Sequence, residues 1–132
     1  MTRNNKKLHD ALIAREVEIV ADAVDAGGAT WDNELNPITH KTGYMVALPR
    51  YEVKLSKYDI VGIVEAVNRS REIIITDGRP TDSYFIDLWI DGDDAYVEIS
   101  LRETRRNVAV AIGKSFDHEA IYDLKNEKNI WV

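Results

Sequence analysis

The sequence concentrates its acidic residues in one stretch, and these carboxylates are the first candidates for chemistry. Between positions 77 and 98 the only cation is Arg79, and the stretch has a formal charge of −6, equal to the net charge of the whole chain. A surface of this sign favours a basic partner, because complementary charge speeds and orients association. We expect a partner-binding surface made of five of these residues: Asp87, Asp91, Asp93, Asp94 and Glu98. The alternative for residues 91–94 is a solvated turn, in which Asp is favoured by its backbone geometry.

The same carboxylates suggest a metal-dependent nuclease as an alternative function. Asp87 or Asp91 would supply the first magnesium ligand and Glu98 the second, an arrangement that activates water. In that pattern a lysine follows two residues after the second carboxylate, and here the position holds Ser100. The nearest cation, Arg102, retains its proton too firmly to act as a base. We therefore expect no metal site, no cofactor and no catalytic residue, and predict that the protein is not an enzyme.

Other side chains capable of chemistry are scattered along the chain. Each histidine lacks a second histidine at metal-ligand spacing, which predicts surface positions for His9, His40 and His118. Four basic residues surround the last predicted helix: Arg102, Arg105, Arg106 and Lys114. The three arginines are expected either to pair with the acidic hairpin or to form a solvated helix face. The tryptophans are either exposed anchors for a partner or core residues. They are Trp31, Trp89 and Trp131.

Composition limits the class of protein. The chain has 132 residues, of which 45% are hydrophobic and 30% charged, as expected for one folded domain spanning residues 1–132. Cysteine is absent, which excludes disulfides, thiolate metal sites and cysteine nucleophiles. No apolar run is long enough for a membrane span, and no apolar segment of the secretory type follows the basic start. We therefore expect a cytoplasmic protein.

The elements that must position these residues follow from hydrophobic periodicity. Helical spacing predicts helices over about 6–26, 60–70 and 103–113, the second preceded by a capping box from Ser56 to Asp59. Alternating apolar residues predict a hairpin of strands 84–90 and 95–101. Residues 29–31 and 38–48 are expected to pair as two further strands, with Pro49 as the stop. Short strands are expected at 73–75 and 120–124, a turn at 77–80, and a buried terminus at 130–132.

The order of these elements favours an α+β fold, a mainly antiparallel sheet with two to three helices packed on it in a single domain. One face of the central hairpin is expected to be buried. The other face carries Phe85, Asp87 and Trp89 and is expected to be partly covered.

Four short motifs resemble those of small proteins encoded by phages and other mobile elements. They are Gly27-Gly28-Ala29-Thr30, Thr42-Gly43-Tyr44-Met45-Val46, Tyr96-Val97-Glu98-Ile99-Ser100 and Ala120-Ile121-Tyr122-Asp123-Leu124. The resemblance implies a binding protein of the anti-CRISPR or anti-restriction type. Such a protein would inhibit a host nucleic-acid-handling complex. Its partner would be a host protein or ribonucleoprotein with a basic surface, without direct contact to nucleic acid or membrane. The resemblance assigns no functional residue. A further alternative is a structural or accessory phage domain, whose exposed edge or aromatic patch would join an assembly.

Overall fold

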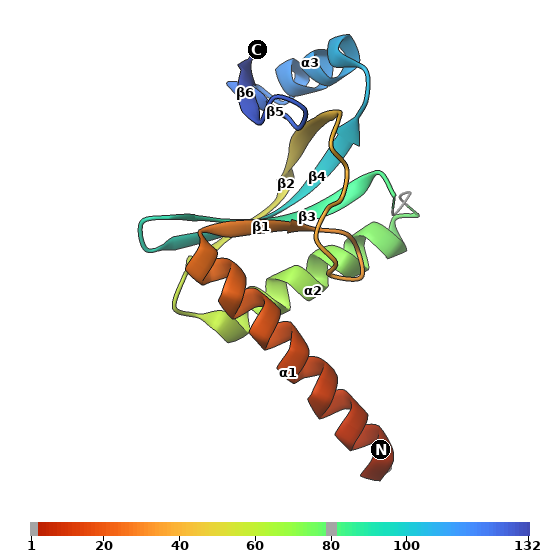
Figure 1. Cartoon of the computed structure of the whole chain (residues 1–132), viewed down its shortest axis with the longest axis vertical. Coiled ribbons are helices and arrows are strands. Elements are labelled where there is room, and N and C mark those ends of the chain that lie inside the picture. Colours follow the sequence, from red (N-terminus) through yellow and green to blue (C-terminus); the bar gives the residue numbers. More distant parts are fainter. Residues whose placement is uncertain (1–2, 79–81) are drawn as a thin grey trace.

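The computed structural model describes residues 3–78 and 82–132, and the side chains of the first helix from residue 14 onward. Its elements are α1 (Arg3–Ala26), β1 (Gly28–Trp31), β2 (Tyr44–Ser56), α2 (Ile60–Thr76), β3 (Tyr84–Asp91), β4 (Asp94–Glu103), α3 (Arg106–Ser115), β5 (Ala120–Asp123) and β6 (Lys128–Trp131). The strands form one antiparallel sheet in the order β1-β3-β4-β2-β5-β6 (Figure 1). The fold is therefore α+β, as the sequence predicts.

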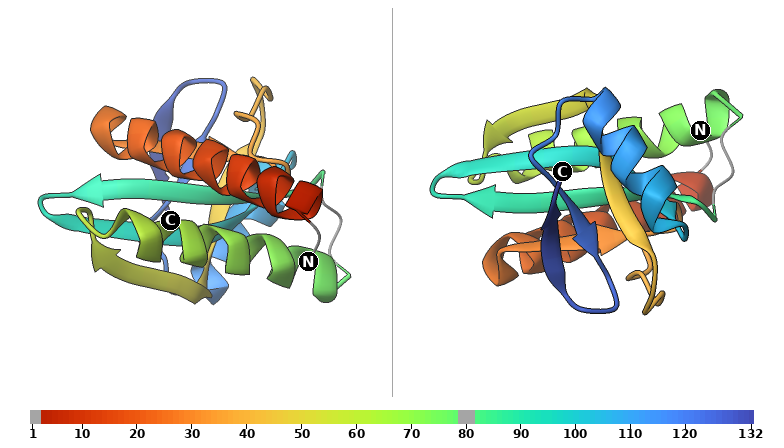
Figure 2. Two further views of the ribbon diagram at one scale, coloured as in Figure 1. Left: turned by 90° about the horizontal axis from the view of Figure 1, so that it is seen from below. Right: turned by 90° about the horizontal axis from the view of Figure 1, so that it is seen from above.

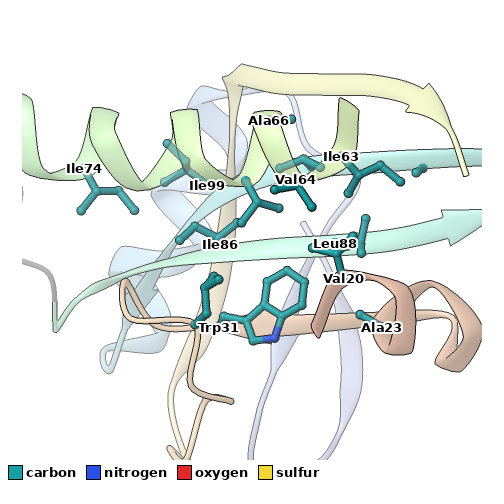
Figure 3. Packing of buried hydrophobic residues seen from close by; sticks show 14 of the residues in the cluster. Val20, Ala23, Trp31, Ile63, Val64, Ala66, Ile74, Ile86, Leu88 and Ile99 are labelled. Carbon is teal, nitrogen blue, oxygen red and sulfur yellow. The ribbon is translucent and has the colours of Figure 1, made fainter. Parts of the chain in front are cut away.

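Helices α1 and α2 cover one face of the sheet and enclose the main core (Figure 2). Figure 3 shows Val20 of α1, Ile63 of α2 and Trp31 of β1 directed at Ile86 and Leu88 of β3. The core side chains of β3 and β4 alternate along each strand, because successive strand residues point to opposite faces. Burying each large apolar side chain stabilises the folded state by about 1.5–3 kcal/mol. The apolar side chains of β3 and β4 therefore face the helices, and the opposite face of the hairpin points away from them.

A second, smaller core lies at the other end of the sheet. Helix α3 lies there beside β2 and β5 (Figure 1). Val46, Ala109 and Ile121 are buried between these elements. Gly113 is the point of closest approach, since a Cβ at this residue would lie 2.8 Å from Cγ2 of Ile121. The β5–β6 hairpin consequently rises above the sheet face that α1 and α2 leave free.

The β3–β4 hairpin confirms the clearest prediction from the sequence. Its strands pair from Tyr84 opposite Leu101 to Asp91 opposite Asp94, and Gly92 takes a φ of +59° in the turn. The opposite face is partly covered as expected, because Phe85 is buried while Trp89 is 40% exposed.

The predicted pairing of residues 29–31 with 38–48 is wrong. Strand β1 pairs with β3, and it touches the following segment through an isolated bridge between Trp31 and Pro37. Gly28 permits this pairing, because it has a φ of +148° and a Cβ there would lie 2.5 Å from the carbonyl oxygen of Leu88. Which strand a four-residue strand pairs with depends on tertiary contacts, so the local sequence pattern does not predict it.

The predicted stop at Pro49 is also wrong, since β2 continues to Ser56. The register of β2 against β4 shifts between Leu48 and Val53, and Pro49 is exposed within this irregularity. A proline is tolerated in a strand where no ladder hydrogen bond requires its missing N–H. The bulge also bends β2, which helps the sheet to curl.

The prediction of a strand at 73–75 is wrong, because these residues belong to helix α2. The helix runs to Thr76, burying Ile74 and leaving Ile75 62% exposed, which is helical rather than strand periodicity. Its N-cap is Asp59, whose Oδ1 accepts from the N–H of Gly62 at 2.9 Å, rather than Ser56. In the predicted turn at 77–80, Gly78 has a φ of +66°, and residues 79 and 80 lie outside the described part.

Three terminal predictions also need adjustment. The first helix begins at Arg3, and the last helix begins at Arg106 and ends at Ser115. The final residues belong to β6 and its end, where Ile130 and Val132 pack against the second core. Trp131 between them is 74% exposed, so the prediction that all three residues are buried is wrong for Trp131. Alternation along an edge strand places it on the outer face.

Candidate functional site

A cavity of about 680 Å³ lies on the sheet face that points away from α1 and α2. Its floor contains Thr30 from β1, Asp87 and Trp89 from β3, and Glu98 and Ser100 from β4. Its sides come from β2, β5 and β6 and include Met45, Ala47, Tyr122, Leu124 and Asn129. The cavity therefore combines a mostly apolar wall with a few converging polar groups, the usual composition of a binding site.

Asp87 is held on the cavity floor by two hydroxyl groups. Thr30 donates from Oγ1 to Oδ1 of Asp87 at 2.8 Å, and the Ser100 hydroxyl donates to Oδ2. Burial raises the pKa of the Asp87 carboxyl to about 6, and the two hydroxyl bonds lower that pKa but only partly offset the effect of burial. Asp87 therefore has a fixed orientation and an ionised form that water stabilises poorly.

Glu98 lies directly opposite Asp87 in the register of β3 and β4. It is 9% exposed, and its Oε1 accepts a hydrogen bond of 2.7 Å from Nε1 of Trp89. The pKa of Glu98 is raised to about 7, mainly by burial. The indole bond opposes this rise, while the charge of Asp87 and the hydrogen bond and charge of the neighbouring Glu52 carboxyl contribute to it. The Trp89 ring in turn stacks on Tyr96, with centroids 4.0 Å apart and planes inclined by 8°.

The opposed carboxyl groups are an unfavourable pair for the fold itself. Like charges directly across an antiparallel ladder destabilise it, and partial burial increases the cost. Among the ion pairs of the described residues, none involves Asp87 or Glu98. Within the described part of the chain the pair therefore has no cation as an ion-pair partner, and both residues line the cavity.

The three aspartates at the hairpin turn form a separate group. Asp91, Asp93 and Asp94 follow the cavity floor along the hairpin, and Asp91 is four residues from Asp87, or about 13 Å along the strand. Two of them have lysine neighbours: Lys57 Nζ lies 3.7 Å from Asp93, and Lys54 Nζ lies 3.5 Å from Asp94. The predicted surface is thus continuous along one hairpin but divided into a cavity floor and a partly neutralised turn.

Of the two alternatives for the arginines, pairing with the acidic residues at positions 77–98 is wrong for Arg102 and Arg105. Arg102 donates from Nε to the carbonyl oxygen of Thr42 at 2.9 Å, and Arg105 pairs with Glu103 at 2.7 Å. Arg106 is exposed at the start of α3, as the alternative of a solvated helix face predicts. The lysines that approach the turn come instead from β2 and from the segment before α2, which the register of β2 with β4 brings alongside.

The structure brings together two of the three carboxylates of the nuclease alternative. Asp87 and Glu98 face each other, whereas Asp91 lies near the turn. Among the side chains that the structure describes, those of residues 14–78 and 82–132, no three from His, Asp or Glu are grouped so that they could hold a metal ion. His118 is not simply a surface residue, since its Nε2 lies 2.6 Å from the carbonyl oxygen of Ala47. His40 is exposed beside Phe85, and the side chain of His9 lies outside the described part.

Sequence reasoning missed several side chains of the cavity. Period-two alternation placed Trp89 with Asp87 on one face of the hairpin, and it could have placed Ser100 with Glu98 in the same way. Thr30 could not have been found in this way, because its contact with Asp87 depends on the pairing of β1 with β3. The approach of Glu52 to Glu98 likewise depends on the irregularity in β2.

The chain was compared with protein-family models, curated proteins and solved structures, and no match was found in any of the three. No helix in the described part of the chain is long and apolar enough to cross a membrane.

Proposed function

We propose that this protein is a non-enzymatic binding protein that inhibits a host nucleic-acid-handling complex by covering a basic surface of that complex. The contact is the acidic face of the β3–β4 hairpin, from the cavity floor to the turn. A surface that normally meets phosphate is rich in Arg and Lys, and carboxylates can occupy it in place of phosphate. The proposal involves no cofactor and no membrane.

The observation that carries the proposal is the opposed pair of Asp87 and Glu98 in an open cavity. The pair weakens the ladder and meets no cation among the described residues. Residues that lower the stability of a fold, with no contact that compensates for the loss, are concentrated at functional sites. A cationic partner would supply a positive charge beside these two carboxyl groups.

The position of the hairpin also supports the proposal. Figure 2 shows the β3–β4 turn extending beyond the ends of the neighbouring helices, so a partner can reach it without contacting α1 or α2. Asp91 and Asp93 are exposed there. Exposed charges of this kind affect the association rate more than the final affinity.

An interference assay tests the proposed function. The chain is expressed in bacteria that carry an active CRISPR or restriction system, over a panel of such systems, and the survival of a targeted plasmid is measured. We expect restored survival with at least one system, and a smaller effect for the Asp91→Asn/Asp93→Asn/Asp94→Asn variant. Asparagine retains turn geometry while removing three charges. Unchanged interference across the panel would contradict the proposal.

A further inference from the structure

We propose that the cavity on the free face of the sheet binds one organic cation, a guanidinium or primary ammonium group, between Asp87 and Glu98. The inference rests on the proposed function in one respect: it takes the cation to be an Arg or Lys side chain of the protein partner. It names the group that the partner inserts and the residues that receive it.

The spacing of the two carboxyl groups suits a cation with several N–H donors. Asp87 and Glu98 are directly opposite in an antiparallel ladder, where Cα atoms are about 4.5–5.5 Å apart and side chains leave the same face. One guanidinium can donate to both carboxylates at once, because its five N–H groups lie in a rigid plane. An ammonium group can do the same with two of its three N–H bonds.

The neighbours of the two carboxyl groups orient them in advance. Thr30 and Ser100 donate to the two oxygens of Asp87, and Trp89 donates to Oε1 of Glu98. Each donor fixes a carboxylate without neutralising it. A cation therefore finds acceptors that are already ordered, which reduces the entropy lost on binding.

The walls of the cavity match the rest of an Arg or Lys side chain. Met45, Tyr122 and Leu124 offer apolar surface to an aliphatic stem, as long cationic side chains require when their stems are buried. The Trp89 ring also lines the cavity and is 40% exposed, so it adds aromatic surface for the side chain that carries the cation. The cavity volume of about 680 Å³ exceeds that of one side chain, which leaves room for neighbouring backbone of the partner.

Other ligand classes fit this cavity less well. An anion would meet Asp87, Glu98 and the neighbouring Glu52 without a cation to balance them among the described residues. A neutral ligand would leave the carboxylates uncompensated and further dehydrated, which costs free energy. An organic cation supplies the charge and the donors together.

The test uses the indole N–H signal of Trp89 in the purified full chain. An acetylated arginine methylamide is titrated and followed by two-dimensional nitrogen–proton NMR; the citrulline analogue, which has the same shape and no charge, is the matched ligand control. We expect the Trp89 signal to move with the arginine probe and not with citrulline. The signal of the 74% exposed Trp131 is an internal control and should stay in place.

Matched variants locate the cation. Asp87→Asn and Glu98→Gln should each weaken binding of the arginine probe at least tenfold, while the triple Asn variant of the turn should bind within about twofold of the parent. Two single variants are used because either could affect folding, and unchanged Trp31 and Trp131 signals confirm that a variant is folded. If the turn variant loses binding and the cavity variants retain it, the cation lies at the turn and the inference is wrong.

Further outcomes test the inference and separate it from the proposed function. Equal shifts with arginine and citrulline, or no shift at millimolar probe, would overturn it. Agmatine, a free guanidinium compound, binding more tightly than a pentapeptide with one central arginine would show that the site serves a small molecule rather than a partner side chain. Restored plasmid survival without arginine binding would reject this inference and leave the proposed function standing. Arginine binding without restored survival would reject the proposed function and leave this inference standing.

Discussion

The indole N–H of Trp89 donates a 2.7 Å hydrogen bond to Oε1 of Glu98, its diagonal neighbour across the β3–β4 ladder. This bond is the contact that most favours the ionised form of Glu98 against the effects of burial and of the Asp87 charge. The same indole is stacked on Tyr96, so the donor is held rigidly in place. The hydrogen bond thus joins the buried Glu98 carboxyl group to the partly exposed ring of Trp89.

Replacing Trp89 with Phe should remove the donor while retaining most of the aromatic packing. We expect the pKa of Glu98 to rise further above about 7, since the lost bond is one that lowers it. Stability at pH 8 should fall by about 1–3 kcal/mol, the cost of losing a hydrogen bond to a charged group. Carboxyl NMR titration and urea unfolding measure the two effects. Trp131→Phe is the control and should change stability by less than about 0.5 kcal/mol, because that ring is exposed.

The carboxyl pair should make the protein less stable as the pH rises. The pKa of Asp87 is raised from 3.8 to about 6, and that of Glu98 from 4.5 to about 7. The folded state therefore binds more protons than the unfolded state between about pH 4 and pH 7. Stability falls through this window and the loss is complete above it.

The Asp87→Asn/Glu98→Gln double variant isolates this effect, since the other carboxyl groups are unchanged. As the pH rises from 5 to 8, the free energy of unfolding of the variant should increase relative to that of the parent. The increase should be about 1.4 kcal/mol for each unit of difference between folded-state and unfolded-state pKa that the variant removes. Urea unfolding of both proteins at the two pH values measures the gain. Parallel stability curves for parent and variant would contradict the assignment of raised pKa values.

Gly28→Ala should disrupt the placement of β1 and with it the Thr30 bond to Asp87. The methyl group would lie 2.5 Å from the carbonyl oxygen of Leu88, and the φ of +148° already disfavours alanine. We expect a loss of about 2 kcal/mol or more, measured by thermal or urea unfolding. Gly92→Asn is the matched control: its φ of +59° suits asparagine, nothing lies near its Cβ position, and the loss should stay below about 1 kcal/mol.

The last residues should differ in their contribution to folding. Ile130 packs against the second core, so Ile130→Ala should lower the free energy of unfolding by about 1–2 kcal/mol. Trp131→Ala should have an effect within about 0.5 kcal/mol, because the ring is 74% exposed. A large loss of stability for Trp131→Ala would show that this ring is covered in solution.

The Asp91→Asn/Asp93→Asn/Asp94→Asn variant should fold as stably as the parent to within about 1 kcal/mol. Its ion pairs with Lys54 and Lys57 are exposed, and such pairs contribute little to stability. Association with a complex that the interference assay identifies as the partner should be slower and less sensitive to salt, as measured by surface plasmon resonance at two ionic strengths. Equal association rates for parent and variant at both salt concentrations would show that the turn is only a solvated loop.

The sequence by itself determined the features that depend on local periodicity. Alternation along residues 84–101 predicted the hairpin and its buried face, and helical spacing predicted α1 from position 6 onward. It also determined that the acidic residues share one hairpin, because neighbours in sequence remain neighbours in a hairpin. These properties need only contacts within a few residues, or across one short turn.

Tertiary structure alone decided how that hairpin is completed. The pairing of β1 with β3 brings Thr30 to Asp87. The irregular β2 brings Lys54 to the turn and Glu52 to Glu98, and Lys57, which follows β2, also reaches the turn. In residues 73–75 the buried face of α2 outweighed the strand preference of three isoleucines. The cavity exists because β5 and β6 follow α3 to the free side of a curled sheet. Each of these contacts joins residues far apart in sequence, and local pattern does not record which distant strand a segment meets.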